Sequence, residues 1–406
     1  MANTLLTIDQ IGNEALRLAH EKATFLGTIN RQFDESFGQA DGKIGDTLRI
    51  RLPSQYVRRQ GSRVMDVQDM EEQKTQLVVA TQDGVDMRVN SRQMALDLND
   101  FSKLHLEPAM ASLVSGVESD VLQGCIKATY NVAGTAGTPP VDLVSTGAAR
   151  AKLNQYLAPK DGNRYVQMDS VTMGGLVNGL KGLFQDSEQI KKQYREGLIG
   201  RTAMADFYEN ERVWTLTNAD DVTANSNAAA DVTDGGNTIK IYTDLPIAKQ
   251  TVGSVFTIAG VYACHPETKA AYSHLQQFTI TVADPGTSGT TISPYIYLTG
   301  AKKNVCSSTG ANLAVTDFNS KALTFHGAAS TSYVQNIMYH KDAYTFATAA
   351  LPLMSDAAKC VVKTFDGISL RIWQASDIRN DEMLTRIDIL YGYAAIRPQW
   401  GCRITS

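Results

Sequence analysis

A run of short apolar strands, separated by turn residues, interrupts the middle of this 406-residue chain. The strands are TIKIYT, SVFTIAGVYA, QQFTITVAD, SPYIYLT and KALTFHG. Strand signals at such spacing are typical of a small all-β barrel or sandwich. Mixed helix and strand signals precede residue 214 and return near residue 333. The sequence therefore predicts an α+β chain in which an all-β domain, residues 214–330, is inserted within an α/β domain.

Helix signals lie on the N-terminal side of this insertion. Residues 7–26 predict a helix, because Thr7 and Gln10 have capping-box spacing and an apolar stripe follows. Half of that stripe is alanine, so the helix buries little by itself. A second, longer helix begins at Glu107, which is followed by proline at a position that helices tolerate. Helix and strand signals then alternate from residue 145 to 196.

The insertion begins with a polar stretch at residues 217–237. This stretch is rich in Asn, Asp and Ala and shows no apolar periodicity. We interpret it as a loop or linker, since such composition lacks the apolar side chains that a packed element needs.

Residues 46–80 predict a long two-stranded ribbon with a charged tip. Its arginines come first, at Arg49, Arg51, Arg58, Arg59 and Arg63, and its acids follow, at Asp66, Asp69, Glu71 and Glu72. Two interpretations remain open: a solvated hairpin whose arms neutralise each other, or an arm that pairs its charges with an adjacent copy of the protein. An isolated ribbon is marginal in water, which is consistent with a docking partner. The candidate inter-subunit residues are Arg58, Arg59, Arg63, Asp66, Asp69, Glu71 and Glu72.

The last residues of the chain predict a buried strand. Residues 386–404 first alternate polar and apolar side chains and then become apolar on both faces. Chain ends usually fray unless they are held in a sheet or docked. We therefore expect the C-terminus to be structural.

The charges of the chain nearly cancel, with 38 Lys and Arg against 42 Asp and Glu and a net charge of −4. A protein that reads DNA sequence normally carries a strong basic excess, because phosphate neutralisation supplies much of its affinity. Sequence-specific DNA binding is therefore disfavoured. The five cysteines are scattered and odd in number, which is typical of free thiols in a reducing compartment. We find no signal-peptide pattern and no apolar run of the roughly 18 residues that a membrane helix needs, so we expect cytosolic synthesis and no membrane partner.

Catalytic and metal-binding patterns are missing from the sequence. The nearest metal grouping joins the pair Cys264 and His265 with His274 and Cys306, and its spacing matches no zinc pattern. The chain has no nucleophile elbow, no HExxH, no phosphate loop and no dinucleotide fingerprint. We therefore expect no catalytic residue, no metal and no cofactor, and a protein that is not an enzyme.

Several stretches together resemble the major capsid proteins of tailed bacteriophages with the Hong Kong 97-type fold. They are YHKDAYTFATAALP at 339–352, FTIAGVYACHPETKAAYSHLQQFTITVAD at 256–284 and SLRIWQASDIRNDEMLTRIDILYGYAAIRP at 369–398. The order of N-terminal helix, charged extended loop, long helix and α/β region adds a weaker match. The resemblance covers nearly the whole chain, and it is closest to the coat proteins of short-tailed Salmonella-type phages, which carry an inserted β domain.

This resemblance implies a domain order. The parts would be an N-terminal arm (1–45), an extended loop across a neighbouring subunit (46–86), a peripheral domain with a long spine helix (87–145 and 355–406), an axial domain (146–213 and 331–354) and an inserted β-barrel domain (214–330). The final strand would then complete the sheet of the peripheral domain. The stretch at 217–237 does not align with the family pattern.

The resemblance also implies a function, which is self-assembly through pentamers and hexamers into the icosahedral shell of a tailed double-stranded DNA phage. Such a major capsid protein is assembled in the host bacterial cytoplasm as a procapsid and resides in the virion capsid. The implied partners are a scaffolding protein, a portal protein and packaged DNA touched without sequence preference. Candidate scaffold contacts are Glu14, Asp34 and Glu35 of the N-terminal arm, with a plain solvated face as the alternative.

Two other functions remain open from sequence alone. One is an encapsulin-like nanocompartment shell, which has the same fold but encloses enzymes. The other is a carbohydrate-active enzyme with a β accessory domain, which would be a monomer or small oligomer and not a megadalton particle.

Overall fold

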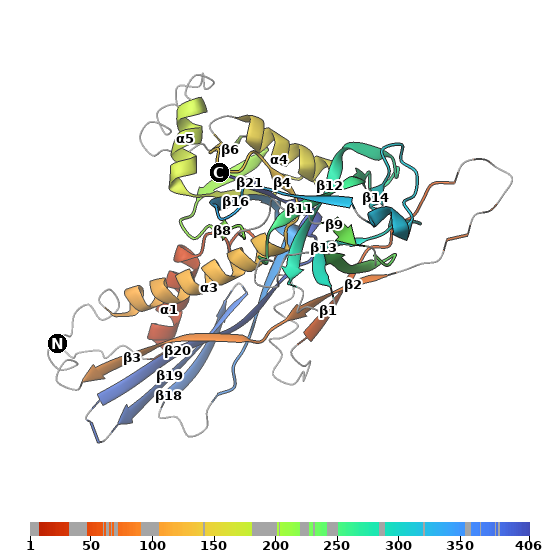
Figure 1. The fold of residues 1–406 in the computed structure, drawn as a ribbon. Coiled ribbons are helices and arrows are strands. Elements are labelled where there is room, and N and C mark those ends of the chain that lie inside the picture. The colour runs from red at the N-terminus through yellow and green to blue at the C-terminus, as the bar shows by residue number, and fades with distance from the viewer. Residues whose placement is uncertain are drawn as a thin grey trace. The chain divides into compact units, whose positions relative to one another are not determined.

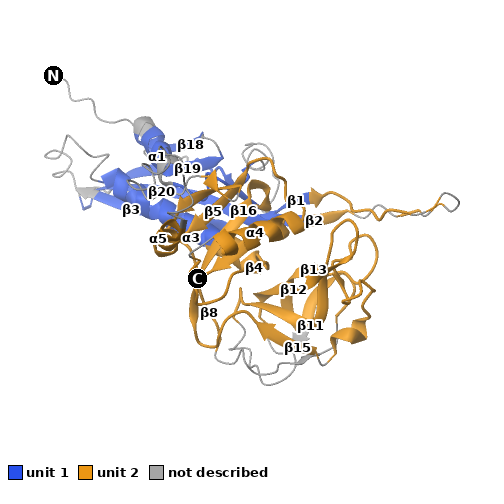
Figure 2. Ribbon diagram, turned by 90° about the horizontal axis from the view of Figure 1, so that it is seen from above, with its two compact units in different colours: residues 1–50, 75–122, 344–396 blue, residues 51–74, 123–343, 397–406 orange. Residues whose placement is uncertain are grey.

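The structure is a computed structural model in which the described residues fall into two units (Figure 2). Described are residues 8–31, 47–59, 61, 65, 67–68, 72–90, 105–140, 143–180, 201–202, 204–219, 227–229, 232–241, 251–283, 289–319, 321–353, 359–365, 367–377, 379–380 and 382–406. Unit 1 comprises residues 1–50, 75–122 and 344–396, and unit 2 comprises 51–74, 123–343 and 397–406.

Unit 1 is built on an antiparallel sheet with the order β17-β20-β19-β18, in which β3 also pairs with β20. The strands are β3 (Thr81–Asn90), β17 (Tyr344–Ala349), β18 (Lys359–Phe365), β19 (Ile368–Asp377) and β20 (Glu382–Ala395). In the register of the sheet, Asp388 on β20 lies opposite both Arg371 on β19 and Gly84 on β3. Strand β20 therefore holds three other strands of the unit together.

Two helices pack on the same sheet, α1 (Ile8–Lys22) and α3 (Glu107–Ala128) (Figure 1). Buried apolar side chains from the helices and the strands line a small cavity between them, among them Ala19, Leu26, Met110, Leu113, Val114, Val117, Leu370 and Ile389. The long helix starts at Glu107 as the sequence predicts, with an acid in its first turn and Lys127 in its last. Both charges suit the helix dipole. The predicted helix at 7–26 is α1, and its expected cap, Thr7, lies outside the described residues.

A second sheet forms part of unit 2 and has the order β4-β21-β16-β5-β7-β6, with β8 paired to β16. Its strands are β4 (Val132–Ala133), β5 (Arg164–Met168), β6 (Arg201–Thr202), β7 (Ala205–Glu209), β8 (Thr215–Thr217), β16 (Ser332–His340) and β21 (Gly401–Thr405). Helices α4 (Leu143–Gln155) and α5 (Ser170–Leu180) pack on this sheet, as the buried Leu153 and Leu176 show. A short 3-10 turn at Lys341–Ala343 follows β16, and another at Pro398–Trp400 precedes β21.

The remaining strands of unit 2 pair in a closed ring, β12-β13-β10-β9-β15-β11 and back to β12, with β14 beside β11. They are β9 (Asn227–Ala229), β10 (Gly236–Ile241), β11 (Val255–Cys264), β12 (Ala271–Val282), β13 (Thr290–Ile296), β14 (Val305–Cys306) and β15 (Lys321–Phe325), with a 3-10 turn at Val315–Phe318. Phe256, Phe278 and Ile280 are fully buried inside the ring. The stretch at 217–237, which we expected to be a loop, contains β9, because backbone pairing with β10 and β15 does not require apolar side chains.

The C-terminal strand is buried along its whole length, as the sequence predicts. The strand does not belong to the sheet that the resemblance implied, in which the residues just before it would be its neighbours in the peripheral domain. β21 pairs antiparallel with β16 and parallel with β4, whereas the preceding β20 belongs to the sheet of unit 1. The 3-10 turn Pro398–Trp400 separates the two strands, so the apolar run at the chain end is two strands and not one.

Candidate assembly interface

The ribbon predicted at residues 46–80 consists of β1 (Thr47–Leu52) and β2 (Gln73–Val78), which pair in a two-stranded sheet. Ile50 and Leu77 are buried, and the polar side chains that alternate with them face outward. This alternation explains why the segment forms strands. Residues 53–72 connect the two strands and form the tip of the ribbon.

The two limbs of the tip are held together by one side-chain amide. Gln68 accepts a hydrogen bond from the backbone N–H of Val57 at 2.8 Å and donates one to the backbone carbonyl of Val57 at 2.6 Å. An amide side chain can satisfy both backbone groups of one residue in this way. The two limbs are therefore held together at Val57 and Gln68, beyond the end of the paired strands.

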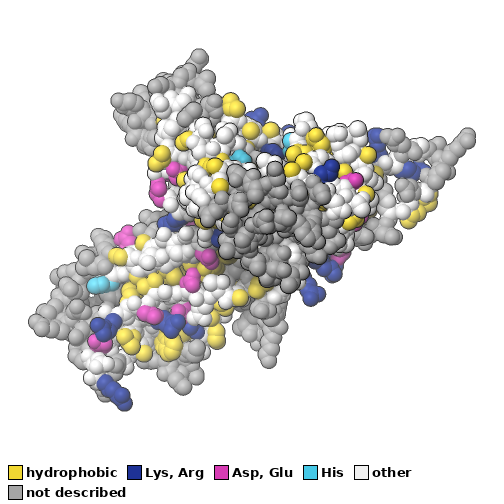
Figure 3. Space-filling view, viewed as in Figure 1, with side chains coloured by type: hydrophobic (Ala, Val, Ile, Leu, Met, Phe, Trp, Pro, Cys, Tyr) yellow, Lys and Arg dark blue, Asp and Glu magenta, His cyan; other side chains and the backbone are white. Residues whose placement is uncertain are grey.

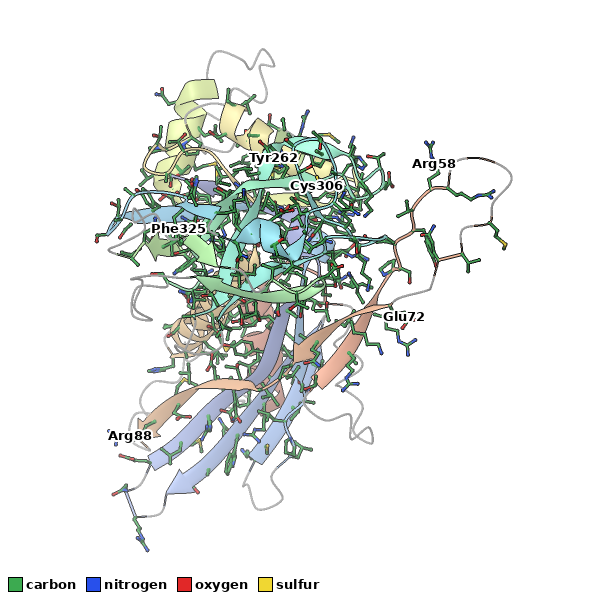
Figure 4. The ribbon with its side chains drawn as sticks, turned by 45° about the vertical axis from the view of Figure 1, so that its right-hand side comes forward. Arg58, Glu72, Arg88, Tyr262, Cys306 and Phe325 are labelled. Atoms are coloured by element: carbon green, nitrogen blue, oxygen red, sulfur yellow. The ribbon has the colours of Figure 1, made fainter. Side chains whose placement is uncertain are left out.

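Charged residues mark both limbs of the ribbon. Figure 4 shows Arg58 on the outgoing limb and Glu72 on the return limb. Glu72 lies 3.5 Å from Arg51, and both side chains are exposed, so this pair is worth at most about 1 kcal/mol. Arg58 and Arg59 are exposed. The other candidate residues of the loop, Arg63, Asp66, Asp69 and Glu71, lie outside the described residues.

The tip also exposes apolar side chains that the sequence reasoning overlooked. Met65 is 83% exposed and Val67 76%, and Tyr56 and Val57 are exposed as well. The signal in the sequence was the pair Met65 and Val67, which flank Asp66, together with Tyr56 and Val57 directly before Arg58. Interfaces combine such apolar side chains with arginine, so this tip has the composition of a contact surface.

The sheet of unit 1 carries a row of charges on one face. Asp388 is fully buried between two arginines, 2.6 Å from Arg371 and 2.8 Å from Arg386. Its hydrogen bond raises the pKa of the Arg386 guanidinium. At the end of β3, Arg88 lies 3.6 Å from Glu382. Figure 3 shows charged and hydrophobic side chains interspersed on the surface in the region of this sheet.

The proposed scaffold residues are only partly described. Glu14 on α1 accepts two hydrogen bonds from Arg17, one turn further along the helix, at 3.0 and 2.8 Å. Asp34 and Glu35 lie outside the described residues. The geometry of Glu14 is that of a solvated helix pair.

Cys264, His265, His274 and Cys306, the nearest metal grouping in the sequence, have other contacts. Cys264 and Cys306 are buried on adjacent strands, β11 and β14, where Tyr262 lies opposite Cys306 (Figure 4). His265 uses Nδ1 to accept backbone N–H groups of the turn that follows it. His274 stacks on Tyr272. Within the described ranges, no three His, Cys, Asp or Glu side chains are placed to hold a metal ion, and no helix is long and apolar enough to cross a membrane.

A ribbon whose tip exposes arginine and apolar side chains is typical of proteins that act by associating with other chains. Comparison with protein families identifies which class this is: the model of the P22 coat protein (gene protein 5) matches residues 31–405. The chain belongs to the P22 coat protein family. It is a major capsid protein, located in the shell of a bacteriophage virion.

Three solved phage structures are similar to this chain at low sequence identity. A structure of Mycobacterium phage Che8 is 11% identical, with 94% of this chain and 90% of that chain covered at a TM-score of 0.49. The capsid of Ralstonia phage GP4 is 8% identical, with coverage of 95% and 91% and a TM-score of 0.45. The capsid of Helicobacter pylori bacteriophage KHP30 is 11% identical, with coverage of 95% and 91% and a TM-score of 0.43. No curated relative matches the sequence.

Proposed function

We propose that the tip of the ribbon, residues 53–72, docks on an adjacent copy of the coat protein and sets its place in the shell. One observation carries this proposal: Met65 and Val67 are largely exposed beside the exposed Arg58 and Arg59, in a tip whose limbs Gln68 clamps together. Burying an exposed Met or Val side chain contributes about 1.5–3 kcal/mol. A preformed tip also loses less conformational entropy on docking.

The charges of the tip have a different role from its apolar side chains. Complementary charges across an interface determine register and reject wrong partners more than they add affinity. In this proposal Arg58 and Arg59 select the partner surface, and Met65 and Val67 contribute the binding energy. Arg51 and Glu72 neutralise each other within the ribbon and stay out of the contact.

Two variants test these roles. The charge reversals Arg58→Glu and Arg59→Glu together should leave the subunit folded and impair shell assembly. The substitutions Met65→Ser and Val67→Ser should do the same by removing apolar contact. Lys160→Glu reverses one exposed charge elsewhere in unit 2 and is the matched control. Assembly is measured by size-exclusion chromatography and electron microscopy, and normal particles from both tip variants would exclude the tip from the contact.

We further propose the partners that accompany a coat protein: a scaffolding protein, a portal protein and packaged double-stranded DNA, with self-association through pentamers and hexamers. The net charge of −4 supports contact with DNA that is weak and independent of sequence. Catalysis has no part in this function. Glu14 stays a candidate scaffold contact, tested by Glu14→Gln: unchanged recovery of scaffold in particles would remove it.

We also propose that residues 214–330 form a separate domain. Residues 214–330, expressed alone, should give a β protein that unfolds cooperatively, because the ring of strands has its own apolar core. A disordered circular dichroism spectrum for that fragment would contradict this boundary.

A further inference from the structure

Two buried cysteines lie on neighbouring strands of unit 2, Cys264 at the end of β11 and Cys306 at the end of β14. The two strands pair antiparallel, with Tyr262 opposite Cys306 (Figure 4). The backbone N–H of Cys264 donates to the carbonyl of Asn304 at 3.0 Å, which continues the pairing as far as this cysteine. Residues two apart on a strand share a face, so Cys264 lies on the face of Tyr262, diagonally across from Cys306.

The thiol of Cys306 leans towards Cys264. Its Sγ lies 3.8 Å from the carbonyl oxygen of Tyr262 and 3.8 Å from the carbonyl oxygen of Ala263. Because Ala263 directly precedes Cys264, the sulfur is displaced along β11 towards the other cysteine. Burial, and then a hydrogen bond with the thiol of Cys306, raises the pKa of the Cys264 thiol to about 12. The two thiols are therefore in contact in the folded chain.

The strand that carries Cys306 can make the small adjustment that a bond between the two sulfurs requires. Cysteines form a disulfide when their Cα atoms lie within about 7 Å, and diagonal positions on paired strands are about 7–8 Å apart. Strand β14 pairs with β11 over two residues, stands at the end of the strand order and is followed by a tight turn at residues 307–310. We propose that Cys264 and Cys306 form a redox site, in which an oxidant joins the two thiols in a disulfide bond between β11 and β14.

The reaction is a two-electron oxidation of the thiols by a small disulfide, R–S–S–R. One cysteine, as its thiolate, attacks a sulfur of the reagent, which breaks the S–S bond, forms a mixed disulfide and releases R–S⁻. The thiolate of the other cysteine then attacks the cysteine sulfur of the mixed disulfide, which forms the bond between Cys264 and Cys306 and releases the second R–S⁻. The two released thiolates take up the two protons that the cysteines lose, so the reagent leaves as two R–SH molecules.

Burial makes this reaction slow, and the environment decides its direction. The thiolate is the reacting form, and a thiol whose pKa is raised by burial, such as that of Cys264, holds little of it. The reaction therefore proceeds when β14 separates locally from β11. Reductants of the cytosol keep thiols reduced, whereas the surroundings of a released virion are oxidising. A coat protein passes from the first environment to the second, so the bond closes after the particle leaves the cell.

The disulfide stabilises the ring of strands in unit 2. Residues 264–306 include β12 and β13, two neighbouring strands of that ring. A disulfide that closes such a loop restricts the unfolded chain, and it typically lowers the unfolding constant by about 30- to 700-fold.

Mass spectrometry of the full-length chain tests the site. The chain is incubated with glutathione disulfide in urea just below its unfolding transition, where local opening is frequent, until the half-buried Cys360 carries a mixed disulfide. Free thiols are then blocked with iodoacetamide, and the chain is digested without reduction. We expect a cross-linked pair of peptides that joins residues 264 and 306 and is two hydrogen atoms lighter than the reduced peptides. The pair should be absent from Cys264→Ser and Cys306→Ser and unchanged in Cys402→Ser, the matched control for a buried cysteine on another strand.

The digest of the wild-type chain decides by itself, so the test does not depend on the folding of any variant. A digest without the cross-linked pair, or with Cys264 joined to Cys402 instead, would overturn the proposal. Urea unfolding followed by circular dichroism tests the consequence: oxidation should lower the unfolding constant of wild type by the factor given above and leave that of Cys306→Ser unchanged. Equal unfolding of oxidised and reduced wild type would refute the stabilising role of the bond. The redox site belongs to the ring of strands and is independent of the role proposed for the tip.

Discussion

Removing the guanidinium of Arg403 should destabilise unit 2 more than any surface change. Arg403 lies on β21 with none of its side chain exposed. Its Nε donates to the carbonyl of Thr129 at 2.7 Å and its Nη1 to the carbonyl of Gly253 at 2.6 Å. Its Nη2 donates to the carbonyl of Lys127 at 3.2 Å and to Oγ1 of Thr279 at 3.0 Å.

These contacts join the C-terminal strand to two other parts of unit 2. Lys127 and Thr129 are at the C-terminal end of α3, where a cation is favourable to the helix dipole. Gly253 and Thr279 belong to the segments that build the ring of strands. Arg403 thus explains why the end of the chain is held in place.

The expected magnitude follows from the acceptors that Arg403→Met would leave behind. Two buried carbonyl oxygens, those of Thr129 and Gly253, would each lose a charged donor, at about 1–3 kcal/mol for each group left unsatisfied, whereas the carbonyl of Lys127 keeps its hydrogen bond from Oγ1 of Thr279. Part of this cost is returned, because the variant no longer buries a cation, so we expect a net loss of about 2–4 kcal/mol. Arg403→Lys keeps the charge but not the planar fork, and it should lose less.

Urea unfolding of the full-length chain, followed by tryptophan fluorescence, to which Trp214 contributes with Trp373 and Trp400, measures this loss. Trp214 reports on the junction, since a Cβ on Gly253 would lie 2.5 Å from its ring. Arg17→Met removes a guanidinium from an exposed helix pair and should change stability by less than about 0.5 kcal/mol. A free energy of unfolding for Arg403→Met within about 1 kcal/mol of wild type would refute the reasoning, because the four contacts would then contribute little.

Three further predictions concern pH, backbone packing and thiol reactivity. Burial, and to a smaller extent Lys152, lowers the pKa of His274 to about 4 from its ordinary value of 6.5, so His274 is neutral in the folded state. Its contribution to stability is present above pH 6.5 and is lost as the pH falls towards 4, and His274→Gln should flatten that part of the unfolding profile. Gly84→Ala should destabilise unit 1 by about 1–3 kcal/mol in urea unfolding, since its Cβ would lie 2.6 Å from Oδ1 of Asp388, whereas Gly116→Ala on α3 meets no atom within 4 Å and should be neutral or stabilising; equal effects would contradict this. Burial raises the pKa of the Cys402 thiol to about 12, so a thiol reagent followed by mass spectrometry should label the half-buried Cys360 first, and early labelling of Cys402 would show that the chain end opens.

The parts of the fold with strong local signals could be predicted from the sequence. The helix at Glu107 has a proline at its first turn, and β5 at Arg164–Met168 lies within residues 145–196, where the sequence predicts alternating helices and strands. Strand β3 was missed, because Asp83, Gly84 and Asp86 disfavour strands and only pairing with β20 makes them one. The sheet of the last strand was also mispredicted, since β21 finds its partners more than 60 residues away on β16.

The charged residues of the tip stand in one continuous run of sequence, which marks them as candidates, and their role in a contact between subunits stays a prediction. The buried polar contacts within each unit could not be predicted. Asp83 and Tyr391 are separated by 308 positions, and Arg403 finds Thr129 across 274. Neither pairing leaves a local pattern, and a buried arginine or tyrosine has the same appearance in sequence as an exposed one. The apolar side chains of the tip had a local signal, but their exposure depends on the clamp between Gln68 and Val57.

Electron cryomicroscopy of particles assembled from this chain tests the association of the tip most directly. The map should show residues 53–72 in continuous density against a second copy of the coat protein, with Met65 and Val67 covered and Arg58 facing an acidic side chain. A tip that projects into solvent in the assembled particle, touching no neighbouring subunit, would contradict the proposed role.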